Sequence, residues 1–276
     1  MNWMIGVVLL VIIGYLLDRE IYFYEGAHLG PRLQAWLYDR WSKNYDKGKR
    51  ASQLHDDEML AQPLLEALSA AHVHEPFVLD FATGTGRLSF ALLNRAEFKG
   101  RIIALDLSQG MLEQAAIKLS ADRIRVEFLR HQSLPLPFPD ASFDAVCALE
   151  VLELFPEMDD PLRELTRVLR PGGVLLTSRG TEESGRRAKV KSTKEFTDLL
   201  EKHGMNQIQI TKWWRLFERV IALKQERSAP SGLMSLSDVL TCSACGYVRW
   251  AKASGAWDCE NCGRRLPVTT EQIVLN

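Results

Sequence analysis

The sequence predicts an α/β protein built on a seven-stranded, mostly parallel sheet whose final strand is antiparallel. Short apolar runs alternate with segments of helical period between residues 76 and 225, and such strands form a parallel sheet with helices on both faces. The last two strand-like runs are separated by so few residues that they must be antiparallel neighbours. An apolar N-terminal region and a cysteine-rich C-terminal region flank this pattern.

The composition is that of an ordinary globular protein. Of 276 residues, 46% are hydrophobic and 25% are charged, and 34 basic against 35 acidic residues give a net charge of −1. A chain so nearly neutral is not expected to be a general nucleic-acid binder. Five cysteines are too few for a disulfide scaffold, and four of them form two Cys-x-x-Cys pairs, which favours a reducing compartment and a bound metal.

Residues 1–24 are predicted to form a membrane anchor with an interface segment. The run from Trp3 to Leu17 carries no charge and is apolar on every face, as a helix immersed in lipid would be. No basic residue precedes it and no small-x-small cleavage site follows, so a cleaved signal peptide is the weaker alternative, beside a helix packed on the protein's own core. The Lys and Arg residues between positions 19 and 50 predict that the rest of the chain faces the cytoplasm.

The remaining elements follow in chain order. A helical lead-in covers residues 25–75, and its Gly-Pro and Lys-Gly breaks predict several short helices before a helical period returns at 51–71. The α/β domain is expected at 76–225, a linker at 226–240 and a separate module at 241–276. Strands are expected at 77–81, 102–107, 124–129, 143–149, 174–178, 207–213 and 217–224, and helices at 88–95, 110–120, 161–169 and 193–203.

The turn after the first strand, in "FVLDFATGTGR", has the pattern of a ligand site. Gly84 and Gly86 would let a ligand lie against bare backbone, and the N–H groups of the next helix would face a polar or anionic group. Asp106, twenty residues after Gly86, is placed to accept hydrogen bonds from ribose hydroxyls. Asp80 would crowd a pyrophosphate but suits an ammonium and a sulfonium, so a nicotinamide cofactor is disfavoured. For both carboxylates, capping of the next turn or helix is the alternative.

Several motifs in order give the chain a family resemblance. From about Tyr38 to Lys224 it resembles the class I S-adenosylmethionine-dependent methyltransferases, and is similar to their quinone-biosynthesis C-methyltransferase group. The resemblance is carried by "VLDFATGTGR", "ALDLSQGML", "LPFPDASFDAV", "ALEVLEL" and "RVLRPGGVLL", with "YDRWSKNYD" upstream resembling a segment that such enzymes carry over the cofactor. It implies a Rossmann-like fold and S-adenosylmethionine as the methyl donor.

Carried over by position, the resemblance places the ribose at Asp106, the adenine at Met111 and Gln132, and the methionine part at the glycine turn. Two residues depart from the family pattern. Ala82 stands where many members have a glycine, and Gln132 stands where an aspartate is usual, although an amide can still bond the adenine amine. Core packing is the alternative for Met111. The expected cofactor-binding residues are Asp80, Ala82, Thr83, Gly84, Gly86, Arg87, Asp106, Leu107, Met111, Gln132 and Ser133.

Methyl transfer from a sulfonium asks little of the side chains. It is an in-line displacement, so alignment and exclusion of water supply most of the acceleration. A base is needed only if the acceptor carries a proton that must leave. Glu150 and Tyr45 are the catalytic candidates, with Glu153 a weaker one, and each could instead be solvated or structural. Cys147 is interpreted as a buried strand residue without a chemical role.

A basic loop follows the fifth expected strand. Its cations are Arg186, Arg187, Lys189, Lys191 and Lys194. A solvated surface loop is one interpretation, and docking on anionic lipid head groups is the other.

The C-terminal cysteines have the spacing of a metal site. Cys242, Cys245, Cys259 and Cys262 form two Cys-x-x-Cys-Gly knuckles separated by thirteen residues, which resembles a zinc ribbon. Structural Zn²⁺ is expected, with iron in a rubredoxin-like site and disulfides as alternatives. Four protein ligands leave no open position for catalysis. This module is expected to bind a protein partner, which could be a second copy of the chain.

Together these features predict a single-pass membrane protein whose methyltransferase domain faces the cytoplasm. Its acceptor is expected to be a lipophilic small molecule, such as a quinone precursor, or a lipid, while a soluble or protein acceptor stays open. The competing function is a membrane-tethered, cofactor-binding scaffold without turnover, which recruits a partner through the zinc ribbon.

Overall fold

The computed structural model, which describes residues 2–181, 183 and 190–276, has the expected α/β fold. Within these residues, eight strands form one sheet in the order β11-β3-β2-β1-β4-β5-β7-β6. β7 runs antiparallel to both neighbours, and all the other pairs are parallel. The strands are β1 (Phe77–Phe81), β2 (Arg101–Asp106), β3 (Val126–Arg130), β4 (Phe143–Ala148), β5 (Leu169–Gly180), β6 (Met205–Trp214), β7 (Phe217–Lys224) and β11 (Ile273–Leu275).

The predicted sheet is confirmed as mostly parallel with an antiparallel strand near its end, but it has one strand more than expected. The additional strand is β11, which comes from the cysteine-rich region and pairs with β3 at the edge of the sheet. β5 begins at Leu169, five residues before its expected start at 174, because α6 ends at Val168 and the chain enters the sheet at once.

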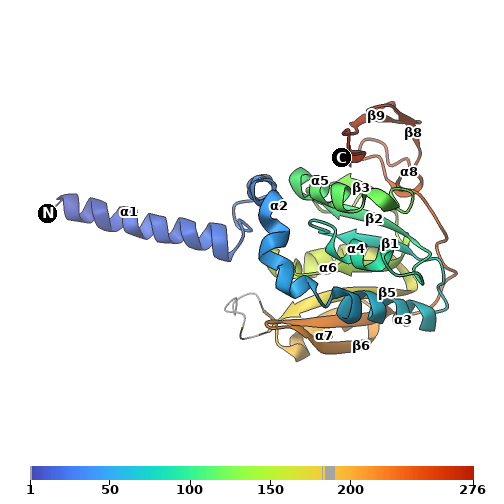
Figure 1. The fold of residues 1–276 in the computed structure, drawn as a ribbon, viewed down its shortest axis with the longest axis horizontal. Helices are drawn as coiled ribbons and strands as arrows, with labels where there is room; N and C mark the ends of the chain where they lie inside the picture. Colours follow the sequence, from blue (N-terminus) through green and yellow to red (C-terminus); the bar gives the residue numbers. More distant parts are fainter. Residues whose placement is uncertain (1, 182, 184–189) are drawn as a thin grey trace.

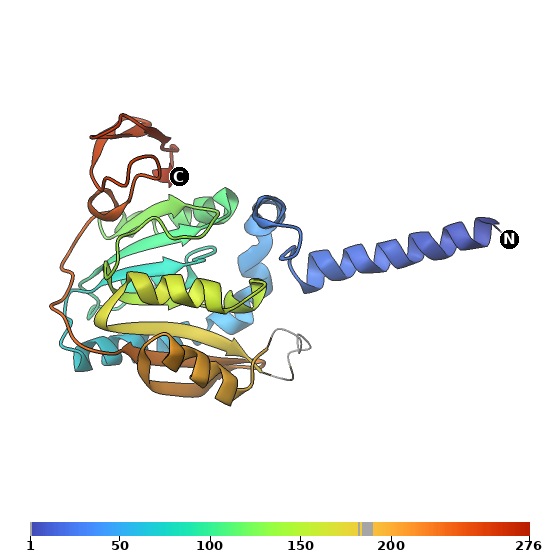
Figure 2. The same ribbon diagram turned by 180° about the vertical axis from the view of Figure 1, so that it is seen from behind.

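Helices cover both faces of the sheet. α3 (Gln62–Ala70), α4 (Arg87–Leu93) and α5 (Gln109–Lys118) lie on the face seen in Figure 1. α6 (Asp159–Val168) and α7 (Thr193–Lys202) lie on the opposite face, which Figure 2 shows.

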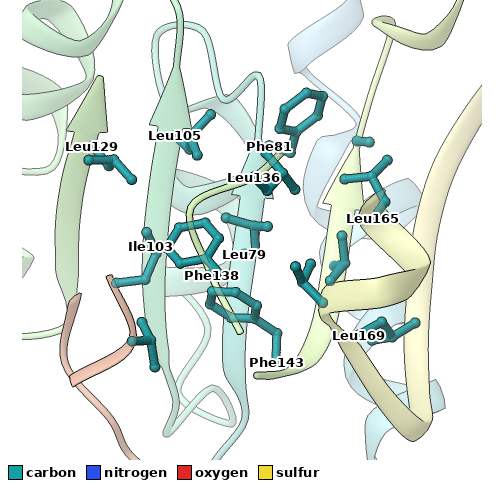
Figure 3. Packing of buried hydrophobic residues seen from close by; sticks show 14 of the residues in the cluster. Leu79, Phe81, Ile103, Leu105, Leu129, Leu136, Phe138, Phe143, Leu165 and Leu169 are labelled. Carbon is teal, nitrogen blue, oxygen red and sulfur yellow. The ribbon is translucent and has the colours of Figure 1, made fainter. Parts of the chain in front are cut away.

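Successive side chains of a strand point to opposite faces of the sheet, so each strand contributes residues to two apolar cores. In β1, Leu79 and Phe81 belong to the apolar cluster under α6, whereas Val78 belongs to the cluster under α4 and α5. Figure 3 shows the first cluster, where Phe138 and Phe143 meet edge to face with ring centroids 5.0 Å apart. Cys147 is fully buried in β4, as expected of a strand residue without a chemical role.

One long helix, α2 (Pro31–Gln53), crosses the carboxyl ends of the strands (Figure 1). The prediction of several short helices here is wrong. Pro31 occupies the first turn of α2, where its missing N–H costs nothing. Gly48 lies inside the helix, and a Cβ there would meet nothing within 4 Å. A glycine in a helix costs only about 1 kcal/mol, which is too little to end α2.

The N-terminal helix α1 (Asn2–Asp18) projects away from the rest of the molecule (Figures 1 and 2) and is followed by the π-helical turn η1 (Arg19–Phe23). It is apolar and exposed along its length. Among the described residues, none of the helices combines the length and the apolar character that crossing a membrane requires. The 17 residues of α1 span roughly 25 Å at about 1.5 Å per residue, short of the ~30 Å hydrocarbon core. The predicted single-pass anchor and membrane location are therefore wrong.

The chain after β7 runs along the amino ends of the strands before it forms the cysteine-rich module (Figure 1). On this path the backbone N–H of Ser231 donates to Asp144, at the start of β4, over 3.0 Å. The module holds the short helix α8 (Leu236–Val239) and a three-stranded antiparallel sheet of β8 (Trp250–Ala253), β9 (Ala256–Cys259) and β10 (Arg265–Pro267). The remaining short helical turns are η2 (Asp57–Ala61), η3 (Ser120–Asp122) and η4 (Leu152–Leu154).

Candidate functional site

The glycine turn between β1 and α4 has an unusual backbone. Ala82, Gly84 and Gly86 have φ values of +54°, +57° and +76°, a region that favours glycine and strains an alanine. A Cβ at Gly86 would lie 3.1 Å from both Ala115 and Leu119 of the neighbouring helix segment. Gly86 therefore allows close packing behind the turn, whereas a Cβ at Gly84 would meet nothing within 4 Å.

Asp106, at the end of β2, ties the turn to the next strand. Its carboxylate accepts hydrogen bonds from the backbone N–H groups of Gly84 at 2.8 Å and Ser108 at 2.9 Å. Burial raises the pKa of Asp106 to about 6, against these two hydrogen bonds, which lower it. The carboxylate thus fixes two loops, as the capping alternative foresaw, and also lines a cavity.

Asp80 lies at the end of β1 and is almost fully buried. Its Oδ2 accepts hydrogen bonds from the hydroxyl groups of Thr83 at 2.7 Å and Ser89 at 2.6 Å. Burial raises the pKa of Asp80, and both hydroxyl bonds oppose that shift. A carboxylate held in this way is oriented before any ligand arrives.

A cavity of about 580 Å³, here called the large cavity, opens beside the ends of β1 and β2. Five of the expected cofactor residues line it, and the amide of Gln132 donates to the carbonyl of Leu107 over 3.2 Å. Apolar side chains form much of the rest of its wall. The expected residues are Ala82, Asp106, Leu107, Gln132 and Ser133, and the apolar ones include Phe81, Leu134, Val151, Leu154 and Phe155.

A small cavity of about 60 Å³ lies on the other side of the glycine turn. It shares Ala82 with the large cavity, so the two meet at the turn. Met111 is buried in α5 and lines neither cavity, and neither does Gly86. The expected residues that line the small cavity are Asp80, Ala82, Thr83, Gly84 and Arg87, joined by Tyr45, Lys49 and Glu150 among others.

Glu150 sits in a network of charges at the small cavity. Its carboxylate contacts Lys49 Nζ at 2.7 Å and Arg87 Nη1 at 2.8 Å, and its own φ is +53°. Arg87 also forms a two-pronged ion pair with Asp56 and lies over the Trp213 ring, 4.8 Å from its centroid. Each carboxylate oxygen of Glu150 thus accepts a hydrogen bond from a cation, Oε2 from Lys49 and Oε1 from Arg87, so neither oxygen faces the cavity unpaired.

Tyr45, the second catalytic candidate, lies on α2 and lines the small cavity together with Lys49. Burial raises the pKa of its phenol, and nearby carboxylates, including Glu25, raise it further. The phenol is therefore neutral at physiological pH, so it can donate a hydrogen bond but is not a ready base. Glu153 is buried and accepts a hydrogen bond of 2.7 Å from the backbone N–H of Gly180.

Two acids of α2 fasten this helix over the strand ends. Both lie in the segment "YDRWSKNYD", but the sequence analysis named neither as a site residue. Asp39 accepts from the Ser108 hydroxyl at 2.6 Å and from the Gly110 N–H at 2.8 Å. Asp46 accepts from the Thr85 hydroxyl at 2.5 Å and pairs with a lysine of α5. Their distance along the chain from the residues that they bind hides both contacts from any local pattern.

His28 is a further side chain that the sequence analysis missed. It lines the large cavity. The backbone N–H of His28 donates to the Glu20 carboxylate over 3.0 Å, and Nδ1 of the His28 ring lies 2.9 Å from the other oxygen of that carboxylate. A carboxylate on Nδ1 favours the tautomer that carries its proton there, so Nε2 is left able to accept one. No described residue bonds Nε2.

The basic loop lies mostly outside the described residues, which exclude Arg186, Arg187 and Lys189. Lys194 is described, and its ammonium pairs with Asp198 over 2.6 Å. The lipid-docking hypothesis for this loop stays a prediction.

The four C-terminal cysteines come together as the spacing predicts. Their sulfur atoms all lie within 4.8 Å of one another, with Cys242 and Cys262 3.7 Å apart and Cys245 and Cys259 3.6 Å apart. These separations exclude disulfides, whose S–S bond is about 2.05 Å. Tetrahedral Zn–S bonds of about 2.3 Å require sulfur atoms roughly 3.8 Å apart, so the cluster fits a zinc ion.

A comparison with known protein families identifies the central part of the chain. Residues 78–173 match a family model described as a methyltransferase domain. The chain carries a methyltransferase domain. The matched segment runs from β1 into β5, so it contains the glycine turn, Asp106, Gln132 and Glu150. This match supports the predicted enzyme class, an S-adenosylmethionine-dependent methyltransferase.

Curated relatives point in the same direction. A demethylmenaquinone methyltransferase from Clavibacter sepedonicus is 37% identical over 50% of this chain and 54% of its own length. A ubiquinone/menaquinone biosynthesis C-methyltransferase from Bartonella henselae is 33% identical over 49% of this chain and 53% of its own. The chain thus spans about half the length of these relatives.

A solved structure supports the fold alone. The structure of an S-adenosylmethionine-dependent methyltransferase from Aquifex aeolicus superimposes with a TM-score of 0.51 and 23% identity, covering 64% of this chain and 96% of that one.

Proposed function

We propose that this protein transfers the methyl group of S-adenosylmethionine to a quinone-type acceptor. The large cavity is the observation that supports this best, because one cavity joins the polar groups of Asp106 and Gln132 to an apolar wall at Val151, Leu154 and Phe155. A flat, apolar ring needs such a wall. The names of the relatives, which refer to demethylmenaquinone and to ubiquinone and menaquinone biosynthesis, agree with an acceptor of this class.

The two cavities suggest how the donor would lie. In this proposal Asp106 accepts from the ribose hydroxyls and Gln132 bonds the adenine edge in the large cavity, while Asp80 faces the ammonium in the small cavity. Ala82, which lines both cavities, would lie beside the sulfur. When bound, S-adenosylmethionine supplies an electrophilic methyl group on a positively charged sulfur.

His28 is the base that this proposal uses. A quinol hydroxyl would give its proton to Nε2 of His28, and the electron pair of the O–H bond would enrich the ring carbon. That carbon would take the methyl group as the methyl–sulfur bond breaks, with the bonding pair leaving on the sulfur as a neutral thioether. The ring proton would then pass to water, which restores the aromatic ring, and the oxygen would recover its proton from His28. Glu20 holds the imidazole ring in place through Nδ1. Glu150 and Tyr45 keep positioning roles, since one is paired with two cations and the other retains its proton.

The cysteine cluster would hold Zn²⁺ through all four thiolates. Such an ion cross-links two knuckles and has no open position, so its contribution is structural. The module's own sheet has strands of only three or four residues, and metal binding would supply part of its folding energy.

Two measurements test the proposed function. Calorimetric titration of the purified chain with S-adenosylmethionine should show one site, lost in the Asp106→Ala variant. Labelled-methyl transfer should then occur to a reduced naphthoquinone that lacks the ring methyl group. Binding of the donor without transfer to any quinol would contradict the acceptor class and favour a scaffold without turnover.

A further inference from the structure

The strand β11 connects the cysteine-rich module to the wall of the large cavity. It pairs with β3 in parallel register, with Val274 opposite Leu129. Directly after it, the backbone N–H of Asn276 donates to the carbonyl of Arg130 over 3.1 Å. The Asn276 side-chain amide lies 3.3 Å from Nδ1 of His131. The module therefore contacts the loop that follows β3.

That loop is part of the proposed cofactor site. His131, Gln132, Ser133 and Leu134 all line the large cavity. His131 has both ring nitrogens engaged, since Nε2 lies 3.3 Å from the carbonyl of Pro135 and Nδ1 meets Asn276. Burial lowers the pKa of this imidazole, so it is neutral and takes one hydrogen bond as donor and one as acceptor. Asn276 thus helps to fix the ring that begins the cavity wall.

A second set of contacts joins the module to the same region from the amino end of β3. Glu127 of β3 accepts from the backbone N–H of Leu236 at 2.8 Å. The backbone N–H of Thr241, next to the first metal-ligand candidate, donates to the carbonyl of Pro137 over 2.8 Å. These contacts hold the two ends of one segment, residues 127–137, against the module.

Apolar packing is continuous across this boundary. The buried cluster under α6, which includes Leu129, Leu136 and Phe138 of the methyltransferase domain, extends into the module. Its members on the module side are Leu236, Val239, Leu240, Cys242, Trp250, Trp257, Cys259, Leu266 and Val274. Two of the four clustered cysteines are thus part of the core that β3 shares.

The module depends on its knuckles for shape. Within it, β8, β9 and β10 contain only four, four and three residues. β11 is held on the module side by an isolated antiparallel bridge between Val268 and Val274. Strands this short are marginal without a cross-link, so the closed cysteine cluster determines whether β11 is presented to β3.

We propose that metal binding at the four cysteines holds β11 on β3 and so fixes the 131–134 wall of the cofactor cavity, which couples metal affinity to S-adenosylmethionine affinity. The module is then a metal-dependent support for the cofactor site within the same chain. The coupling is reciprocal, so bound cofactor also raises the affinity for the metal by the same factor. The cofactor half of this proposal rests on the proposed function, whereas the effect of the metal on β3 does not.

The test uses the full chain with and without zinc, which is removed by a chelator and checked by metal analysis. Amide hydrogen exchange should rise in β3 and in residues 131–134 after removal, while β1 stays protected. S-adenosylmethionine should bind about tenfold more weakly, within the usual range of such couplings. A variant without residues 272–276 keeps all four cysteines, and it should retain zinc and show the same exchange and the same weaker binding.

Arg265→Ala is the matched control, because this side chain is exposed on β10 and its change should alter neither readout. Unchanged exchange in β3 after zinc removal would overturn the proposal, and so would unchanged cofactor affinity in the variant without β11. Failure of the zinc-loaded chain to bind S-adenosylmethionine would instead refute the proposed function, and the exchange measurement would still decide the role of the metal.

Discussion

At the scale of single residues, Asp106 links the chemistry of the site to pH. Burial raises its pKa to about 6, and the ionised form is the one that accepts from ribose hydroxyls. As pH falls through 6, protons compete with the ligand, so we expect S-adenosylmethionine to bind progressively more weakly, by up to about tenfold per pH unit. Calorimetry between pH 5 and 7.5 measures this.

Asp106→Asn is the control for that pH dependence, because it keeps the shape of the side chain and removes its charge. His131 lines the same cavity and also titrates, but it is unchanged in both proteins. An equally steep loss of affinity in Asp106→Asn would assign the effect to another group.

His28 gives a second prediction at this scale. His28→Asn should lower the rate of methyl transfer by roughly 10² to 10⁴, the usual contribution of a general base. In a plot of the single-turnover rate against pH, the His28→Asn variant should no longer show the rise in rate that accompanies deprotonation of a general base. Glu20→Gln should lower the rate by a smaller factor than His28→Asn does. An unchanged pH profile in His28→Asn would exclude this histidine as the proton acceptor.

Glu150 is expected to matter for structure rather than for proton transfer. Glu150→Gln weakens the contacts to Lys49 and Arg87, so the free energy of unfolding should fall by about 1 to 3 kcal/mol in urea titrations. The pH profile of the transfer step should keep its shape. If Glu150→Gln instead abolished the rise in rate with pH, Glu150 would be identified as the general base.

Most of the residues that line this candidate site could be predicted from the sequence, whereas several contacts between distant parts of the chain could not. Asp80, Asp106 and Gln132 stand in local motifs at strand ends, where the order of the elements alone brings them to one edge. Met111 belongs to the second motif but is buried in α5, because the direction of a side chain on a helix depends on its position around the helix axis. His28 reaches the cavity only through the path of the chain before α2, which no motif records.

At the scale of elements, α2 behaves as a cover for the strand ends that two carboxylates fasten. Asp39→Ala removes the bonds to Ser108 and Gly110, which lie at the start of α5. We expect a loss of about 1 to 2 kcal/mol in stability, the usual effect of deleting such a cap, and weaker S-adenosylmethionine binding. Lys43→Ala, an exposed change on the same helix, should alter neither quantity. Equal effects from the two variants would show that Asp39 does not fasten the helix.

Strand positions were predicted well, because burial on both faces leaves an apolar run between turn residues. Where the prediction failed, tertiary contacts overrode local signals. Gly48 did not break α2, and the prediction gave no sign that β11, a three-residue strand, would join the main sheet. Its partner β3 lies more than 140 residues earlier in the chain, so the pairing depends on the path of the linker and module rather than on a local pattern.

At the scale of the whole molecule, the methyltransferase sheet and the cysteine-rich module form one packed body, while α1 stands apart from it (Figure 1). Every described side chain of α1 is exposed, including Trp3 at 73%. Apolar surface of this extent favours association in water. The contacts of α1 with the turn η1 contribute no buried side chains to either core.

Removal of residues 2–18 should therefore leave the folded body intact. We expect the midpoint of thermal unfolding to change by less than about 2 °C and S-adenosylmethionine affinity to stay within about twofold, since a surface change away from the core has little effect. Self-association, measured by analytical ultracentrifugation against the full chain in the same buffer, should decrease, because the apolar helix that drives it is gone. A large drop in unfolding temperature or in cofactor affinity would instead show that α1 packs on the site in solution, in an arrangement different from the extended one seen here.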